Sequence, residues 1–115
     1  MITLYHNPRC SKSRDALALL EQRQQPFHVV EYLKTPLDAT ALKSLLQKLD
    51  LPIRALLRTK EDEYQQLELA NPELSEQQLI AALTAHPRLL ERPIVVNGDK
   101  AVIGRPLENI VAILT

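Results

Sequence analysis

The chain has 115 residues, which is enough for one domain with its own core. Apolar residues make up 45% of it, which excludes a disordered protein, and the 3% of aromatic residues argues against nucleic-acid binding by base stacking. Lys and Arg total 14, as do Asp and Glu, so the chain lacks the net positive charge that drives non-specific nucleic-acid binding. We therefore expect a domain with an aliphatic core and no nucleic-acid partner.

Membrane insertion and metal binding are also unexpected. No apolar run approaches the ~20 residues that a membrane-spanning helix needs, and the N-terminal residues lack the pattern of a secretory signal, so we expect a cytoplasmic protein without a membrane partner. Cys10 is the one cysteine, which excludes an intramolecular disulfide and a Cys-rich metal site. We expect no bound metal or cofactor, and any redox chemistry needs a thiol from another molecule.

The N-terminal third predicts a strand, a helix and a second strand. Residues 2–5 are apolar and end at a His-Asn-Pro sequence, which is typical of a strand followed by a loop. Helical spacing of apolar residues then predicts a helix that starts near Cys10–Ser13, with Ser11 or Ser13 as its cap. Residues 27–32 predict the second strand, and this order of elements implies a parallel pair.

Residues 35–86 are predicted to be helical. Thr35-Pro36-Leu37-Asp38 is expected to start a helix, with a cap followed by Pro at the first helical position. Its apolar face is formed by Leu42, Leu45, Leu46 and Leu49. Ser75-Glu76-Gln77-Gln78 matches a capping box at the start of a later helix, which His86-Pro87 ends.

The last third predicts a hairpin and a helix. Pro93-Ile94-Val95-Val96 reads as a strand, Asn97-Gly98 as a hairpin turn and Ala101-Val102-Ile103 as the return strand. Gly104-Arg105-Pro106 is expected to start the final helix, whose core positions are Ile110, Val111, Ile113 and Leu114. The predicted fold class is therefore α/β, with a small mixed sheet covered by helices.

Cys10 lies at the predicted junction between a loop and a helix. Unpaired N–H groups at a helix start favour negative charge, and the thiolate is the nucleophilic form of cysteine. Several groups that can carry positive charge lie within a few residues of it: His6, Arg9, Lys12 and Arg14. Cys10-Ser11-Lys12-Ser13 resembles the redox C-x-x-C spacing with Ser13 in the second position. The polar surroundings favour a reactive thiol over the alternative of an inert buried cysteine, whereas His6 has either a role there or only a hydrogen-bonding one.

Three arginines are candidates for an oxyanion pocket. A guanidinium group is always charged and presents paired donors, which suits a tetrahedral anion. Arg92 and Arg105 each precede a proline at a junction that can face the same end of the sheet as Cys10. Arg58 comes from the helical segment, and spacing alone does not choose between it and Arg54, one turn away. Each arginine is also compatible with a solvated surface position.

These residues fall within four stretches that together resemble the glutaredoxin-linked arsenate reductases, the ArsC family, over nearly the whole chain. The stretches are Tyr5-His6-Asn7-Pro8-Arg9-Cys10-Ser11-Lys12-Ser13-Arg14, Ile53-Arg54-Ala55-Leu56-Leu57-Arg58, Arg92-Pro93-Ile94-Val95-Val96 and Gly104-Arg105-Pro106. The resemblance implies a single domain, residues 1–115, with a thioredoxin-like fold and a helical insertion at about 35–86. Ser11, where Gly often follows the cysteine, and the absence of a long tail after the final helix are typical of a short branch of the family.

The resemblance also implies roles for individual residues. Cys10 would be the nucleophile, His6 would assist thiolate formation, and Ser13 would hydrogen-bond the sulfur. An arsenate or similar oxyanion would be bound by Arg58, Arg92 and Arg105. Pro93 would follow a cis peptide bond. Glutathione would be a co-substrate that is not permanently bound, and glutaredoxin would restore the thiol.

Two other functions remain open at this point. Spx-type transcription regulators, which bind RNA polymerase, resemble the same fold, but they typically carry a C-x-x-C switch whose second position is Ser13 here. A monothiol glutathione-dependent reductase needs only one cysteine. A pocket of three arginines would be unusual for the mixed disulfides on which such a reductase acts.

Overall fold

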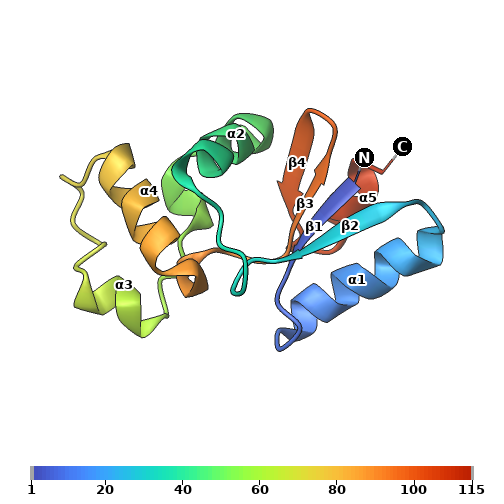
Figure 1. The fold of residues 1–115 in the computed structure, drawn as a ribbon, viewed down its shortest axis with the longest axis horizontal. Helices are drawn as coiled ribbons and strands as arrows, with labels where there is room; N and C mark the ends of the chain where they lie inside the picture. Colours follow the sequence, from blue (N-terminus) through green and yellow to red (C-terminus); the bar gives the residue numbers. More distant parts are fainter. Residues whose placement is uncertain (1, 115) are drawn as a thin grey trace. The chain divides into compact units, whose positions relative to one another are not determined.

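A computed structural model describes residues 2–114. It contains a mixed four-stranded sheet in the order β2-β1-β3-β4 (Figure 1). β1 (Ile2–His6) pairs parallel with β2 (Phe27–Glu31) and antiparallel with β3 (Ile94–Asn97). β3 also pairs antiparallel with β4 (Lys100–Ile103). The predicted α/β class and the mixed sheet are confirmed.

The chain forms two compact units. The first combines the residues up to Thr35 with those from Arg92 onward, and it holds the sheet with α1 (Ser11–Arg23) and α5 (Glu108–Ala112). The second, Pro36–Glu91, consists of helices. The organisation as one domain with a helical insertion stays a prediction.

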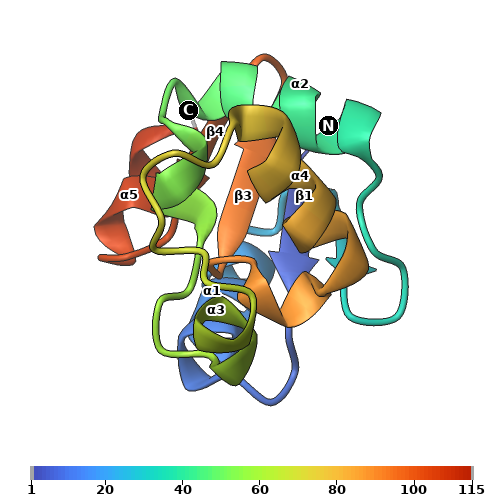
Figure 2. The ribbon, with the colours of Figure 1, turned by 90° about the vertical axis from the view of Figure 1, so that its left-hand side faces the viewer.

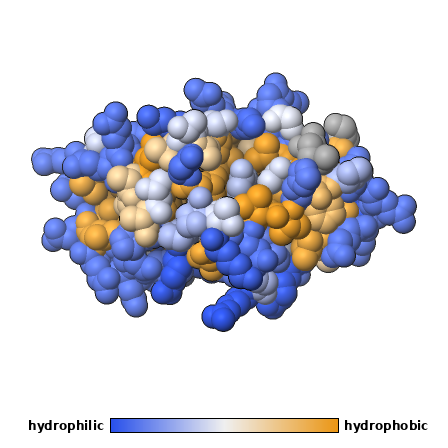
Figure 3. Space-filling model, viewed as in Figure 1, coloured by the Kyte–Doolittle hydropathy of each residue, from blue (hydrophilic) through white to orange (hydrophobic). Residues whose placement is uncertain are grey.

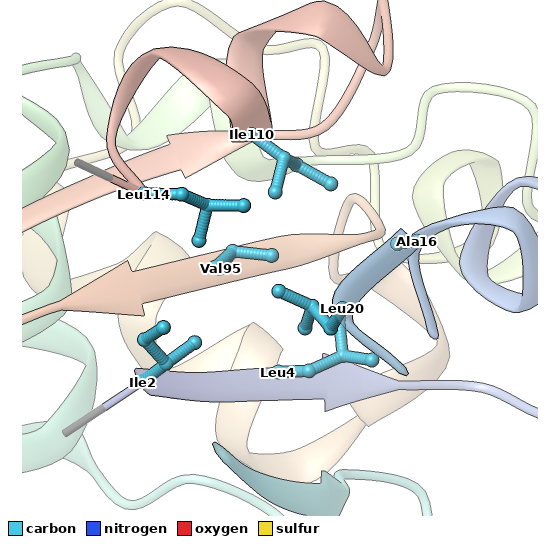
Figure 4. Close-up of a cluster of buried hydrophobic side chains, with 7 residues drawn as sticks. All are labelled: Ile2, Leu4, Ala16, Leu20, Val95, Ile110 and Leu114. Atoms are coloured by element: carbon cyan, nitrogen blue, oxygen red, sulfur yellow. The ribbon is translucent and has the colours of Figure 1, made fainter. Parts of the chain in front are cut away.

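The core of the first unit lies on one face of the sheet, where Figure 4 shows side chains from two strands and two helices pointing toward one another. Leu4 of β1 and Val95 of β3 are paired in register, and both are fully buried. Leu20 of α1 and Ile110 of α5 pack in the same cluster. Both helices therefore cover this face, and burial of their apolar side chains supplies the hydrophobic stabilisation that holds them there.

The N-terminus of α1 differs from the prediction. Cys10 is the N-cap residue, with extended backbone angles of φ −96° and ψ 123° and no capping bond from its side chain. The predicted cap at Ser11 or Ser13 is wrong, because both serines already lie in the first helical turn. The hydroxyl of Ser13 is buried and bonds to the end of β1 instead.

The second unit is built from α2 (Ala39–Leu49), α3 (Asp62–Gln66) and α4 (Glu76–Ala85), with 3-10 turns η1 (Ile53–Leu56) and η2 (Pro87–Leu89). α4 contacts α2 and both 3-10 turns, and Figure 2 shows it beside α2. The four leucines predicted for the apolar face of α2 are all buried. This confirms the helical periodicity read from the sequence.

The two caps of these helices were predicted with different success. The capping box of α4 is confirmed: Gln78 donates its N–H to Oγ of Ser75 at 3.1 Å, and Ser75 donates its N–H to Oε1 of Gln78 at 2.8 Å. α2 begins after the predicted start, because Asp38 is its N-cap and accepts the N–H of Ala41 at 2.8 Å. Thr35 belongs to the turn after β2, where its N–H donates to the carbonyl of Glu31.

The hairpin and α5 also begin at slightly different residues. Asn97 pairs with Lys100, so the turn is Gly98-Asp99, with φ +65° at Gly98. α5 starts at Glu108, and Val111, which was predicted to be a core residue, is 37% exposed because it lies about 100° around the helix from buried Ile110.

None of the described helices is long and apolar enough to cross a membrane. Hydrophilic residues form much of the surface seen in Figure 3.

Candidate active site

Three site residues predicted from separate stretches meet at one end of the sheet. Cys10 follows β1, Arg92 precedes β3, and Arg105 follows β4. Because β3 is antiparallel to β1 and to β4, its first residues lie beside the ends of both neighbours. The topology thus brings Cys10, Arg92 and Arg105 together in the first unit.

Arg105 contacts both of the other residues. Its Nη2 lies 3.8 Å from Sγ of Cys10, and its Nε donates to the backbone carbonyl of Arg92 at 2.7 Å. The Arg92-Pro93 peptide bond is cis, as predicted, and so is Arg105-Pro106. A guanidinium group is therefore held beside the sulfur by a backbone acceptor.

The surroundings of Cys10 favour its ionised form. Burial by itself raises the pKa of this thiol. Donation to the sulfur from the backbone N–H of Ser13, from the guanidinium of Arg92 and from the N–H of Lys12 lowers the pKa, and so does the positive charge of Arg92. The lowering contributions prevail, and the pKa of Cys10 falls below its ordinary value. This agrees with the interpretation of Cys10 as a reactive thiol.

His6 and Ser13 form a buried hydrogen-bonded pair. The hydroxyl of Ser13 lies 2.6 Å from Nδ1 of His6 and accepts the backbone N–H of Asn7 at 3.0 Å. Burial is the largest influence on His6 and lowers its pKa, which favours the neutral imidazole. Ser13 therefore contacts the sulfur through its backbone N–H, whereas its side chain hydrogen-bonds with His6.

Asn7 shapes the loop that carries Cys10. Its side-chain Oδ1 accepts the N–H of Arg9, and its carbonyl accepts the N–H of Cys10, each at 3.0 Å. Arg14 donates to the carbonyl of Pro8 at 3.1 Å. Arg14, one of the nearby cations in the sequence, thus supports the loop with its guanidinium group.

Tyr32 is a site residue that the sequence analysis did not single out. It follows β2 directly and is fully buried. β2 is parallel to β1, so Tyr32 lies at the same end of the sheet as the Cys10 loop. Its hydroxyl interacts with the guanidinium group of Arg92, which in turn interacts with the sulfur. An aromatic residue with a polar tip at the end of a predicted strand was the available signal.

Arg58 lies in the second unit, so its place in an oxyanion pocket with Cys10 stays a prediction. Its Nε donates to Oε1 of Glu61 at 3.2 Å, and its Nη1 donates to Oε1 of Glu91 at 3.3 Å. The side chain is 21% exposed. Two carboxylates thus hold the guanidinium group while leaving it accessible.

Arg54 has a different role from Arg58. Its Nη1 donates to the carbonyl of Leu69 at 2.8 Å, and its Nη2 donates to the carbonyl of Asn71 at 2.7 Å. These bonds attach the η1 turn to the chain after α3. Arg54 is accounted for by backbone support, which leaves Arg58 as the candidate for an anionic ligand.

The described residues contain no group of three or more His, Cys, Asp or Glu side chains that could hold a metal ion. The chemistry that the first unit offers is that of one activated thiol beside two guanidinium groups.

Comparison with known proteins identifies the family of the chain. The model of the ArsC family matches residues 5–113, which is nearly the whole chain. The chain belongs to the ArsC family. Its fold is the thioredoxin-like fold of ArsC proteins, and the motif stretches that carried the resemblance all lie within the matched residues.

Relatives within the ArsC family match this chain end to end. A protein of Neisseria meningitidis serogroup A named arsenate reductase is 53% identical over 114 residues, which cover 98% of this chain and 97% of that protein. A protein of Escherichia coli (strain K12) named YfgD is 50% identical, with coverage of 98% and 96%. The solved structure of an arsenate reductase from Vibrio cholerae superimposes with a TM-score of 0.95 at 46% identity, covering 98% of this chain and 97% of that one.

Proposed function

We propose that this protein is an arsenate reductase that uses Cys10 as its nucleophile and glutathione as the second thiol. The observation that carries the proposal is the Cys10 sulfur with its lowered pKa and with the guanidinium groups of Arg92 and Arg105 beside it. An ArsC relative that is 53% identical to this chain is named arsenate reductase, which supports arsenate as the oxyanion substrate.

The first step is attack of the thiolate on arsenic. Arsenate is negatively charged and would repel a thiolate, so Arg92 and Arg105 neutralise its oxygens, and Arg58 is the proposed third ligand. Sγ of Cys10 forms a bond to arsenic, and one arsenate oxygen leaves as hydroxide or water. Tyr32 positions Arg92 for this step, and His6 with Ser13 supports the turn whose N–H groups bond the sulfur.

The second step needs another thiol, because the chain contains only Cys10. The glutathione sulfur bonds to arsenic as its S–H bond breaks and the proton moves to an arsenate oxygen. A sulfur–sulfur bond to Cys10 then forms as both sulfur–arsenic bonds break, and arsenic takes up two electrons. The arsenic thus leaves as arsenite, and Cys10 and glutathione are left joined in a mixed disulfide. Glutaredoxin restores the Cys10 thiol by thiol–disulfide exchange.

A coupled assay with arsenate, glutathione and glutaredoxin tests this function. We expect turnover by the wild-type protein, none by Cys10→Ser, and none when either thiol component is omitted. Mass spectrometry should detect glutathione on Cys10 when glutaredoxin is left out. Turnover of a glutathionylated thiol without arsenate reduction would overturn the proposal in favour of a monothiol reductase. The cytoplasmic location stays a prediction from the sequence.

A further inference from the structure

A cavity of about 270 Å³ opens in the first unit beside the Cys10 site. We call it the α1 cavity. It is lined by Lys12, Asp15, Gly104, Arg105, Pro106 and Leu107. Its volume is near the lower end of the range for small-molecule sites, ~300 Å³, so it fits part of a small peptide rather than a protein segment.

Two lining residues of the α1 cavity also contact the sulfur. Nη2 of Arg105 lies 3.8 Å from Sγ of Cys10, and the backbone N–H of Lys12 donates to the same atom. A molecule bound in the α1 cavity therefore contacts residues that themselves contact the Cys10 sulfur. A second thiol held in this cavity is therefore close to the sulfur with which it would react.

The charges of the α1 cavity do not suit an oxyanion alone. Arg105 and Lys12 are cationic, but Asp15 is anionic and lies three residues after Lys12 on α1. An acidic side chain beside an anion site repels the anion. Neither Lys12 nor Asp15 forms an ion pair or side-chain hydrogen bond with another residue in the 2–114 range. Both charges remain available to a ligand that carries both signs.

From this charge pattern we infer that the α1 cavity binds the zwitterionic end of the thiol co-substrate, with Asp15 accepting from its ammonium group and Lys12 bonding its carboxylate. The inference rests on the proposed function, because it locates the second thiol of that reaction. Glutathione carries two carboxylates and one ammonium group, opposite to the two cations and one anion that line the cavity. Pro106 and Leu107 supply apolar contact for its methylene groups.

The test uses thiol exchange at Cys10 without arsenate, so it is separate from the test of arsenate reduction. Cys10 is first converted to its mixed disulfide with thionitrobenzoate. Stopped-flow absorbance then gives the rate at which glutathione or 2-mercaptoethanol releases the chromophore. The ratio of the two rates measures recognition of the charged part of glutathione, because any change in the reactivity of Cys10 affects both thiols.

We expect Asp15→Asn and Lys12→Gln each to lower this ratio about tenfold, which corresponds to the loss of one charge-assisted hydrogen bond. N-acetylcysteine, which has no ammonium group, should have the same rate relative to 2-mercaptoethanol in wild type and in Asp15→Asn. Cysteamine, which has no carboxylate, should have the same rate relative to 2-mercaptoethanol in wild type and in Lys12→Gln. The matched controls are Asp99→Asn and Lys100→Gln, which make the same chemical changes on the exposed β3–β4 hairpin.

Unchanged ratios in both α1-cavity variants, or equal losses in the hairpin controls, would overturn the inference. Binding of S-methylglutathione, which cannot react, gives a second measurement by amide chemical shifts. The shifts should concentrate at residues 104, 105 and 107, which carry amide N–H groups, and shifts confined to the second unit would also overturn the inference. If glutathione selectivity depends on Asp15 but arsenate is not reduced, the thiol site stands and the proposed function fails.

Discussion

Nδ1 of His6 and the hydroxyl oxygen of Ser13 lie 2.6 Å apart, and both side chains are buried. This contact joins the last residue of β1 to the first turn of α1, whose N–H groups reach the Cys10 sulfur. The helix start that activates the thiol is thereby tied to the strand that carries its loop.

Ser13→Ala should destabilise the protein. The substitution leaves Nδ1 of His6 and the N–H of Asn7 without their buried partner, at a cost of ~1–3 kcal/mol in the free energy of unfolding. Urea unfolding measures the difference. Ser44→Ala, on the exposed face of α2, is the matched control and should be neutral. Equal stability of Ser13→Ala and wild type would contradict the importance of this bond.

The stability of the protein should fall on mild acidification because of His6. Burial lowers its folded-state pKa below the ordinary 6.5, so the unfolded chain takes up a proton at a higher pH than the folded one does. The free energy of unfolding is therefore unaffected by protonation of His6 above about pH 6.5, and it decreases as the pH falls from there toward the lower folded-state pKa. Urea unfolding across this range should show the slope in wild type and in the exposed-site variant His28→Gln. A slope that persists unchanged in His6→Gln would assign it to another group.

Tyr32→Phe should weaken the site through Arg92. Loss of the hydroxyl removes its interaction with the guanidinium group of Arg92, and we expect kcat/KM for arsenate to fall about tenfold. The pKa of Cys10 should rise, because Arg92 lowers it. Iodoacetamide alkylation against pH reports this pKa, and its midpoint should move to higher pH. Tyr64→Phe, in the second unit, is the matched control. A midpoint that does not move would limit Tyr32 to a packing role.

Arg58 is a proposed ligand of arsenate, and on that proposal Arg58→Ala removes a guanidinium bond to the oxyanion and should raise KM about tenfold or more. Arg88→Ala is a close control, since Arg88 also pairs with Glu61, at 3.1 Å, but is 62% exposed. Both variants remove a cation from the same carboxylate. Steady-state kinetics with equal KM changes in both would show that the carboxylate cluster, and not oxyanion binding, explains the effect.

The two glycines of the chain should respond differently to alanine. A Cβ at Gly104 would lie 2.8 Å from Cδ1 of Ile110 and 2.9 Å from Cγ of Pro93, so overpacking should cost ~1–3 kcal/mol. A Cβ at Gly98 meets no atom within 4 Å, and only the backbone angle of φ +65° opposes it, at a cost of ~1 kcal/mol. Thermal unfolding compares them. Gly104→Ala should also slow arsenate reduction, since Pro93 adjoins Arg92, and a normal rate would contradict this coupling.

The local sequence pattern was sufficient to predict an element where each residue type could have only one structural role. The four leucines of α2 have the helical period, and the Ser75–Gln78 capping box has a fixed spacing. Cap prediction failed where several capable residues stand close together, as at Ser11 and Ser13. The residue that caps is the one at which the backbone leaves the extended conformation, and at α1 this is Cys10.

By itself, the sequence determined that the chain has a single thiol near a helix start and that any redox chemistry at this thiol needs a second thiol from another molecule, because residue type and local spacing decide both points. Only the tertiary structure decided which groups surround the sulfur. Arg92, Arg105 and Tyr32 come from segments far apart in the chain, and strand pairing brings them to one edge of the sheet. Ser13 likewise bonds His6 with its hydroxyl and the thiol with its backbone, because packing of α1 on the sheet orients that side chain toward β1.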